Sequence, residues 1–385
     1  MRIFLSFLQS KKNYPIPSYS FWQYYIKNGI EEAGYEWSEC PGADWALGLV
    51  PQNAEDLLRW KQDTWGKTVA WLKKNPADIF LSYLYPSQVD LSAIREIQRM
   101  GIPCVNFFCD HVREFRTLPE EFGAFNNNWV PEYKAIKLYT DAGYPFINLP
   151  MPMWVEPKYR ILREEVNQQI TFIGSKDMQR VLLLERLVKQ DPKIPLAIYG
   201  AGWNGESNGA LPYENSPDYT LLKKIKFNKD FIRSQGIAPF IRKIKYRNLT
   251  YNTSPALSSR THRSPDFETY NELIAGSMIS LGINRYESFH YPLYKPNSYS
   301  RLRDIEAPML GACYLTEYTE GLEELYDIEN EIMAYLDAED LFIKIQQLQA
   351  DPAKRKSLKI NGQKKALGKH NIPSSLNIIL QRVMH

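Results

Sequence analysis

The chain has 385 residues, enough for two domains of ordinary size, and its hydrophobic content of 44% allows each domain a sizeable core. The formal net charge of +3 is close to neutral and does not by itself indicate a nucleic-acid-binding protein. No apolar run reaches membrane-spanning length, and the first one, Met1–Phe7, is too short for a signal peptide, so we expect a cytoplasmic protein.

The cysteines and histidines do not form a recognisable metal-binding pattern. The four cysteines are widely spaced, without a C-x-x-C pair, and we expect free, buried thiols: Cys40, Cys104, Cys109 and Cys313. The five histidines lack H-x-x-x-H spacing or regularly spaced carboxylate partners. We therefore predict that the protein has no cofactor and works without a metal.

Strand-like and helix-like segments alternate in the first part of the chain, which is typical of a parallel sheet covered by helices. The expected strands are Met1–Phe7, Ala77–Tyr83, Pro103–Cys109 and Asn126–Val130, with a further apolar run at Trp45–Val50; the expected helices are Phe21–Ala33, Ala54–Lys73, Val89–Met100 and Pro131–Gly143. The proline-punctuated segment Ile147–Met153 suits a connector, so we place a domain boundary near residues 155–168.

The same alternation resumes after this boundary. The expected strands are Gln169–Ser175, Leu196–Gly200, Met278–Ile283 and Cys313–Thr316, and the expected helices are Asp177–Lys189, Ala307–Ala312, Asp337–Leu348 and Ser374–Met384. Strand, glycine turn, helix and strand is the pattern of a doubly wound fold. The sequence pattern thus predicts two α/β domains.

The stretch Arg301–Gly321, RLRDIEAPMLGACYLTEYTEG, combines charged residues with a short apolar helix and a strand. Guanidinium groups match phosphate oxygens, and one carboxylate can accept both hydroxyls of a ribose. Arg301, Arg303 and Glu306 at the start of the helix are therefore candidates for holding a nucleotide. The alternative is a surface ion pair followed by a core helix.

Two glycine turns follow expected strands of the second domain, at the end where parallel sheets bind ligands. In the first, Gly174 lets a phosphate approach backbone N–H groups, and Ser175 and Arg180 add donors. In the second, Gly202 precedes Trp203, which could stack on a base or pack in the core. Either turn could also be a plain connection between a strand and a helix.

Asp110 and His111 follow directly after the expected strand Pro103–Cys109. At a strand end, an aspartate could orient a histidine that acts as general acid or base, or could act alone as the base. The alternative is a helix start, because aspartate is a preferred N-cap residue.

Residues 204–265 form a long insertion between expected strands. From Leu221 to Arg263 we count eleven Lys and Arg residues against one acid, Asp230. The insertion could be a solvated basic face, could hold an anionic or lipid-linked acceptor at a membrane surface, or could bind nucleic-acid phosphates.

The order of features after Arg303 resembles the C-terminal half of the CgeB-like glycosyltransferases, a GT-B group also described as glycosyl transferases group 1. The shared features are R-x-x-E before a small apolar helix, a strand ending in Leu-Thr, the Tyr318–Gly321 loop, the helix that begins at Asp337, Asp351-Pro352 and His370-Asn371. The resemblance covers about the last hundred residues well and extends more loosely back to Ile170.

The resemblance implies a GT-B architecture: two Rossmann-like domains whose parallel sheets face each other across a cleft. We expect an acceptor domain at residues 1–160, a nucleotide-sugar domain at 161–370 and a closing helix at 371–385. The resemblance also implies that Glu306 binds ribose hydroxyls, that Arg303 and Arg301 bind the diphosphate, and that Thr319 and Asn284 contribute to the donor site. Related families have a second glutamate eight residues before this one, where the present chain has Ser298.

The function expected from this resemblance is transfer of a sugar from a UDP- or GDP-linked donor to an unidentified acceptor, a glycan, protein, lipid-linked molecule or nucleic acid. One alternative is a GT-B-like binding or assembly protein without activity. Another is a nucleic-acid-modifying glycosyltransferase that uses the basic segment 221–263.

Overall fold

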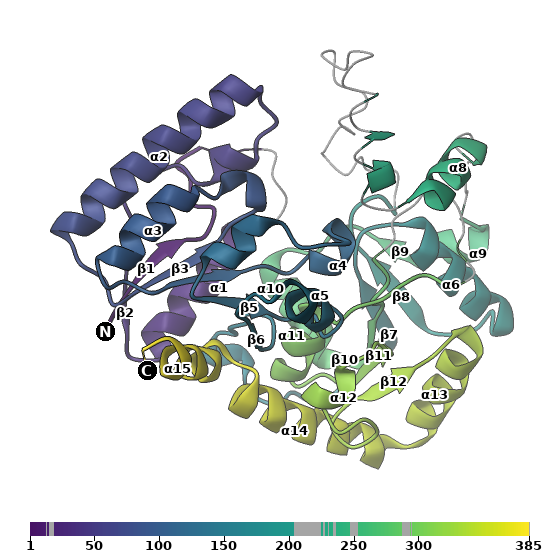
Figure 1. The fold of residues 1–385 in the computed structure, drawn as a ribbon. Coiled ribbons are helices and arrows are strands. Elements are labelled where there is room, and N and C mark those ends of the chain that lie inside the picture. Colours follow the sequence, from purple (N-terminus) through teal and green to yellow (C-terminus); the bar gives the residue numbers. More distant parts are fainter. Residues whose placement is uncertain are drawn as a thin grey trace. The chain divides into compact units, whose positions relative to one another are not determined.

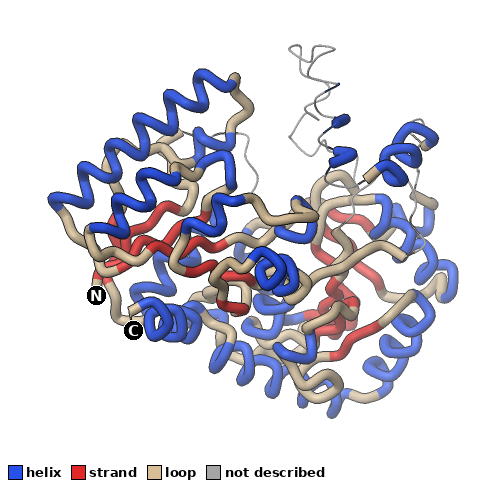
Figure 2. The backbone as a smooth tube through the Cα atoms, viewed as in Figure 1, coloured by secondary structure: helices blue, strands red, loops and turns tan. Residues whose placement is uncertain are grey.

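The computed structural model describes residues 1–12, 14, 19–203, 225, 228–229, 231–233, 236–246, 253–286, 293 and 295–384. They form two compact units. The first contains Met1–Trp154 and the segment from Gly368 onward, and the second contains Val155–Leu367. Each unit has a six-stranded parallel sheet flanked by helices (Figures 1 and 2). The predicted fold class, two Rossmann-like α/β units, is confirmed.

The sheet of the first unit has the strand order β2-β1-β3-β4-β5-β6. Its strands are β1 (Arg2–Ser6), β2 (Glu36–Ser38), β3 (Ile79–Tyr83), β4 (Cys104–Phe107), β5 (Asn127–Val130) and β6 (Ile147–Asn148). Its helices are α1 (Tyr19–Glu32), α2 (Ala54–Lys74), α3 (Leu91–Arg99), α4 (His111–Glu114), α5 (Ala135–Ala142) and α15 (Ile372–Val383).

The apolar run Trp45–Val50 does not form a strand. It contains a short 3₁₀ helix, Ala46–Leu49, and the fully buried Trp45 packs edge-on against Trp65 of α2, with ring centroids 5.0 Å apart. The strand next to β1 is instead the short β2. A short apolar run has the same composition whether it pairs in a sheet or packs beneath a helix, so its periodicity cannot separate the two.

The sheet of the second unit has the order β12-β11-β10-β7-β8-β9. Its strands are β7 (Asn167–Ile173), β8 (Leu196–Tyr199), β9 (Thr261–His262), β10 (Ser277–Gly282), β11 (Tyr314–Glu317) and β12 (Met333–Tyr335). Its helices are α6 (Met178–Gln190), α8 (Ile237–Lys245), α9 (Pro255–Ser258), α10 (Phe267–Gly276), α11 (Arg303–Met309), α12 (Leu322–Leu325), α13 (Ala338–Ala350) and α14 (Pro352–Lys369).

The strand order of this second sheet reverses between β7 and β10. From β7 the chain proceeds to β8 and β9 on one side, and then crosses over to β10, β11 and β12 on the other. Open α/β sheets bind ligands beside the carboxyl ends of the strands at such a reversal. The ends of β7 and β10 are therefore where a ligand site is expected on geometric grounds.

Helix α15 belongs to the first unit and packs against α1. Ile372 lies against Gly29, where an added Cβ would come within 2.5 Å of the isoleucine side chain. Asn371 forms a parallel bridge with Met153 just before the helix begins. The backbone thus leaves the first unit after Trp154 and returns to it with its last helix.

Most of the expected basic insertion, 204–265, lies outside the described residues. Within it the structure describes residues 225, 228–229, 231–233, 236–246 and 253–265, including α8 and α9. Across the described part of the chain, no helix is both long enough and apolar enough to cross a membrane. All four cysteines are free and buried, as expected.

Candidate functional site

The turn after β7 is fixed by its own arginine. Asp177 caps α6 by accepting hydrogen bonds from the backbone N–H groups of Gln179 and Arg180. This start brings Arg180 back over the turn, where its Nη1 donates to the carbonyl oxygen and the hydroxyl of Ser175, at 2.7 and 3.1 Å. Arg180 and Ser175, both predicted from the sequence, therefore lie together at the end of β7.

The turn after β8 closes onto the turn after β7. The Gly174 N–H donates to the Tyr199 carbonyl at 2.8 Å, and Gly200 has a φ of +137°. A Cβ at Gly200 would come within 2.3 Å of the Gly174 carbonyl oxygen, so only glycine fits this approach. The two glycine turns form one rigid surface at the edge of the sheet.

Trp203 packs in the core of the second unit. Its side chain is 4% exposed, its Nε1 donates to the Gly174 carbonyl at 2.7 Å, and its ring meets Phe172 edge-on. This geometry corrects the interpretation of Trp203 as a base-stacking residue, because its indole is occupied by the protein. Gly202 has a φ of +84° and directs the chain into this packed position.

Three arginines lie close enough together for their charges to interact. The pKa of Arg180 is lowered to about 10, first by burial and then by the positive charge of Arg301, with a further contribution from Arg303. Among the described residues, neither Arg180 nor Arg301 has a carboxylate at ion-pair distance, and the Nε atom of each is buried without a hydrogen-bond partner. Such a cluster is a strong site for an anion.

Glu306 is held by two neighbours in the second unit. Its Oε2 lies 3.3 Å from the Nε of Arg303 and accepts a hydrogen bond from the hydroxyl of Tyr270. The Arg303 guanidinium also lies over the Tyr270 ring, 4.8 Å from its centroid. The structure therefore brings together Glu306 and Arg303, as predicted, and adds Tyr270 of α10, which sequence reasoning missed.

A second ion pair, which the sequence did not predict, lies at the same edge of the sheet. Arg285, just after β10, donates from Nε to Glu317 Oε1 at 2.8 Å and from Nη1 to the Gln179 carbonyl at 2.9 Å. Glu317 is the last residue of β11 and is buried. The available signal was positional, because both residues stand at the carboxyl ends of neighbouring parallel strands.

Asn284 was predicted to contribute to the nucleotide-sugar site, but in the structure it holds parts of the protein together. Its buried Nδ2 lies 3.0 Å from Asp304 Oδ2, 3.2 Å from Thr316 Oγ1 and 3.0 Å from the Glu317 carbonyl. Since an amide has only two protons, these contacts consume its donor capacity. Asn284 therefore fixes the β10 end to α11 and β11 rather than facing a ligand.

Asp304 is the centre of this buried network. Its carboxylate accepts hydrogen bonds from the Tyr314 hydroxyl, the Thr316 hydroxyl and the Arg301 N–H, at 2.8, 2.9 and 3.0 Å. Burial raises the pKa of Asp304, while these hydrogen bonds oppose the shift. Through the Arg301 backbone, Asp304 positions the start of α11 and hence the arginine cluster.

Thr319 lies in the loop after β11 and is 2% exposed. Its carbonyl accepts from the Leu322 N–H at 3.1 Å, but its hydroxyl has no hydrogen-bond partner among the described residues. A buried hydroxyl without a partner is costly, and a ligand oxygen would satisfy it. This observation supports the expectation that Thr319 contributes to a binding site.

The predicted catalytic pair lies in the first unit. His111 is fully buried, with Nδ1 3.2 Å from Glu132 Oε2 and Nε2 2.8 Å from the Tyr139 hydroxyl. Because both ring nitrogens are occupied inside the protein, the interpretation of His111 as an acid or base needs correction, and we assign it a structural role. Asp110 is partly exposed and precedes α4 without capping it through its side chain.

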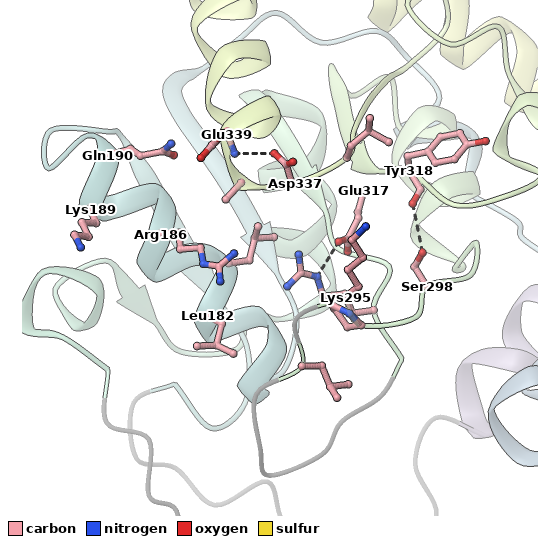
Figure 3. A pocket seen from close by; sticks show the side chains of 16 residues that line it. Leu182, Arg186, Lys189, Gln190, Lys295, Ser298, Glu317, Tyr318, Asp337 and Glu339 are labelled. Atoms are coloured by element: carbon pink, nitrogen blue, oxygen red, sulfur yellow. Dashed lines mark hydrogen bonds and ion pairs between the residues drawn. The ribbon is translucent and has the colours of Figure 1, made fainter. Parts of the chain in front are cut away.

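A cavity of about 1010 Å³ opens between α6, α13 and the loop that carries Lys295 and Ser298 (Figure 3). The Arg285–Glu317 pair forms part of its wall, and Ser298 donates to the Tyr318 carbonyl at 3.3 Å. Ser298, which stands where related families have glutamate, therefore lies beside the end of β11.

Burial raises the pKa of Glu317, although Arg285 opposes the shift. The folded chain thus binds a proton here at higher pH than the unfolded chain does. The contribution of Glu317 to the free energy of unfolding should fall as pH rises from about 4.3 through the folded pKa.

We therefore expect the stability of wild type relative to Glu317→Gln to decrease as pH rises from about 4 through the folded pKa of Glu317, as measured by urea denaturation. The same comparison with Glu339→Gln, an exposed carboxylate on α13, is the control. A relative stability that increases with pH would contradict this expectation and show that the attraction of Arg285 outweighs burial.

Comparison with known proteins matches one part of the chain to a family model. Residues 240–381 match the model of a family described as glycosyl transferase-like. No curated protein sequence is similar enough to count as a match.

Solved structures resemble the chain over nearly its full length at low sequence identity. Sucrose-phosphate synthase from Thermosynechococcus elongatus is 12% identical, with a TM-score of 0.58 over 100% of this chain and 99% of that one. A glycosyltransferase from Rickettsia africae is 10% identical, with a TM-score of 0.57 over 100% and 98%. HepE from Anabaena, in complex with UDP and glucose, is 10% identical, with a TM-score of 0.54 over 99% of each chain.

The solved structures show that the chain has a GT-B fold, and its segment 240–381 matches the glycosyl transferase-like family model. The narrower resemblance to the CgeB-like group stays a prediction.

Proposed function

We propose that this protein transfers a sugar from a nucleoside diphosphate sugar, UDP- or GDP-linked, to an acceptor hydroxyl, and that arginines replace a metal ion at the diphosphate. The observation that carries the proposal is the pairing of Arg180 with Arg301 at the β7–β10 reversal without a carboxylate partner among the described residues. A diphosphate supplies the close anionic partner that neither Arg180 nor Arg301 has among the described residues.

The remaining donor contacts follow from the same edge of the sheet. Glu306, oriented by Tyr270 and Arg303, accepts from the ribose hydroxyls. The Thr319 hydroxyl and the backbone of the Gly174 turn donate to phosphate or sugar oxygens. The bound UDP and glucose in HepE support a nucleotide and sugar in a protein of this fold.

In the transfer step, the bond between the anomeric carbon and the diphosphate oxygen breaks, the acceptor oxygen bonds to that carbon, and the acceptor hydroxyl proton passes to the released diphosphate or to solvent water. Negative charge grows on the leaving diphosphate. Arg180 and Arg301, held in place before the reaction, stabilise that charge in the transition state more than in the ground state. The arginine cluster therefore contributes to rate as well as to donor affinity.

Thermal denaturation with UDP, GDP, ADP, CMP or TDP, each with EDTA or Mg²⁺, tests the proposal. A nucleotide at a hundred times its dissociation constant should stabilise the second unit by about 2.7 kcal/mol, equally with EDTA and with Mg²⁺. A response that requires Mg²⁺ would contradict metal independence. The described residues contain no cluster of three metal-ligating groups, but a metal bound through the diphosphate would not need one.

A nucleotide sugar then separates an enzyme from a binding protein. An enzyme releases the nucleoside diphosphate over time, whereas a binding protein is stabilised without turnover. Well-folded protein that responds to none of the nucleotides would overturn the proposal.

A further inference from the structure

Helix α8 lies within the basic insertion, between β8 and β9, at the periphery of the second unit (Figure 1). None of its nine residues, all of which the structure describes, is buried. Three isoleucines at helical spacing i, i+4 and i+7 form one apolar face: Ile237, Ile241 and Ile244 are 63%, 59% and 54% exposed. Packing against the described residues of the unit therefore does not account for this face.

Cations flank the isoleucine face. At about 100° per residue, Lys245 and Arg242 follow the stripe on one side, and Lys243 lies on the other. Lys243 also lies over the ring of Phe231, 5.1 Å from its centroid, and Phe231 contacts Phe240. An apolar stripe bordered by Lys and Arg is the arrangement of helices that lie in the interface of an anionic membrane.

The chemistry of α8 separates the possible partners. Nucleic acid would engage the cations through phosphates but would give three exposed isoleucines nothing to bury against. In a two-fold contact between copies, the cations bordering one stripe would approach those of the other and repel. Anionic lipid provides acyl chains for the isoleucines and phosphate groups for the cations at the same depth.

We propose that α8 docks the protein on an anionic lipid bilayer, with Ile237, Ile241 and Ile244 inserted among the acyl chains and Arg242, Lys243 and Lys245 at the headgroup phosphates. The charge of the surrounding sequence is complementary to such a surface, since Leu221–Arg263 contains eleven cations and one acid. The proposal does not depend on which nucleotide or acceptor the enzyme uses.

Co-sedimentation of the full chain with vesicles tests the proposal. We expect binding to phosphatidylcholine vesicles that contain about 30 mol % phosphatidylglycerol and little binding to phosphatidylcholine alone, with a loss of binding at high ionic strength. The triple variant Ile237→Ser, Ile241→Ser, Ile244→Ser should bind at least about tenfold more weakly. The variant Arg242→Gln, Lys243→Gln, Lys245→Gln should lose the preference for anionic vesicles.

The matched control is Ile343→Ser with Ile360→Ser, which removes exposed isoleucines from α13 and α14. This control should bind vesicles like wild type, and all variants should keep the wild-type melting temperature. Unchanged vesicle binding by the isoleucine variant would overturn the proposal. Failure to bind vesicles would also overturn the proposal. Salt-sensitive binding to DNA would then identify nucleic acid as the partner, and a wild-type dimer that the isoleucine variant dissociates would identify a second copy of the chain.

Discussion

Replacing Arg180 with methionine is expected to lower kcat/KM for the nucleotide sugar by about 10²–10³-fold. The guanidinium lies at the end of β7 beside Arg301 and has no carboxylate partner among the described residues, so its charge is available to a diphosphate. Methionine keeps an apolar stem near the Phe172 ring, over which Arg180 lies at 5.7 Å. Steady-state kinetics with saturating acceptor measures the effect.

Two further variants separate charge from local structure. Arg180→Lys keeps the positive charge but loses the two hydrogen bonds to Ser175, so it should recover part of kcat while KM stays raised. Arg382→Met, an exposed position on α15, is the matched control and should behave as wild type. Near-wild-type kcat/KM in Arg180→Met would remove this arginine from the donor site.

Replacing Asp304 with leucine is expected to destabilise the second unit by about 3–5 kcal/mol. The substitution removes the acceptor of the buried Tyr314 and Thr316 hydroxyls and of the Arg301 N–H, and it takes one of three contacts from the Asn284 amide. Urea denaturation measures the loss, and nucleotide binding should weaken in the folded fraction because α11 is no longer fixed to the sheet.

The control for Asp304 is Asp63→Leu in the first unit. The Asp63 carboxylate is largely exposed and, among the described residues, pairs with Lys67 one helical turn away, so we expect a change within about 0.5 kcal/mol. If Asp304→Leu unfolds at the same urea concentration as wild type, the network is not a structural support for the arginine cluster. Wild-type stability with weaker nucleotide binding would instead indicate direct contact between Asp304 and ligand.

The sequence carried the information for most of the fold. Alternating periodicity, capping residues such as Asp177 and Asp337, and glycines that end helices predicted the four inner strands of each sheet and the long helices α1, α2, α3, α6, α13 and α15. It did not predict the edge strands β2, β6, β9 and β12, because two or three residues leave too short a pattern to recognise, and it also missed the helices α10 and α14.

Site residues could be predicted only where a chemically suitable side chain also stands at the end of an expected strand or the start of an expected helix. Arg180 precedes Arg301 and Arg303 by more than a hundred residues. All three nevertheless stand next to a strand end or a helix start at one edge of the sheet. Residue type does not reveal burial, so His111 and Trp203 were interpreted as functional although the core uses their polar atoms. Tyr270 and Glu317 were missed because their partners are distant in sequence.

The return of the last helix to the first unit has a consequence for biosynthesis. The β-strands of the first unit leave the ribosome early, but α15, which covers Gly29 of α1, follows only after Val155–Leu367 has been made. At roughly 5–20 residues per second, this delay is about 10–40 s. During that interval the face of α1 around Gly29 lacks the cover of Ile372, so the first unit completes its packing only after the second unit has been synthesised.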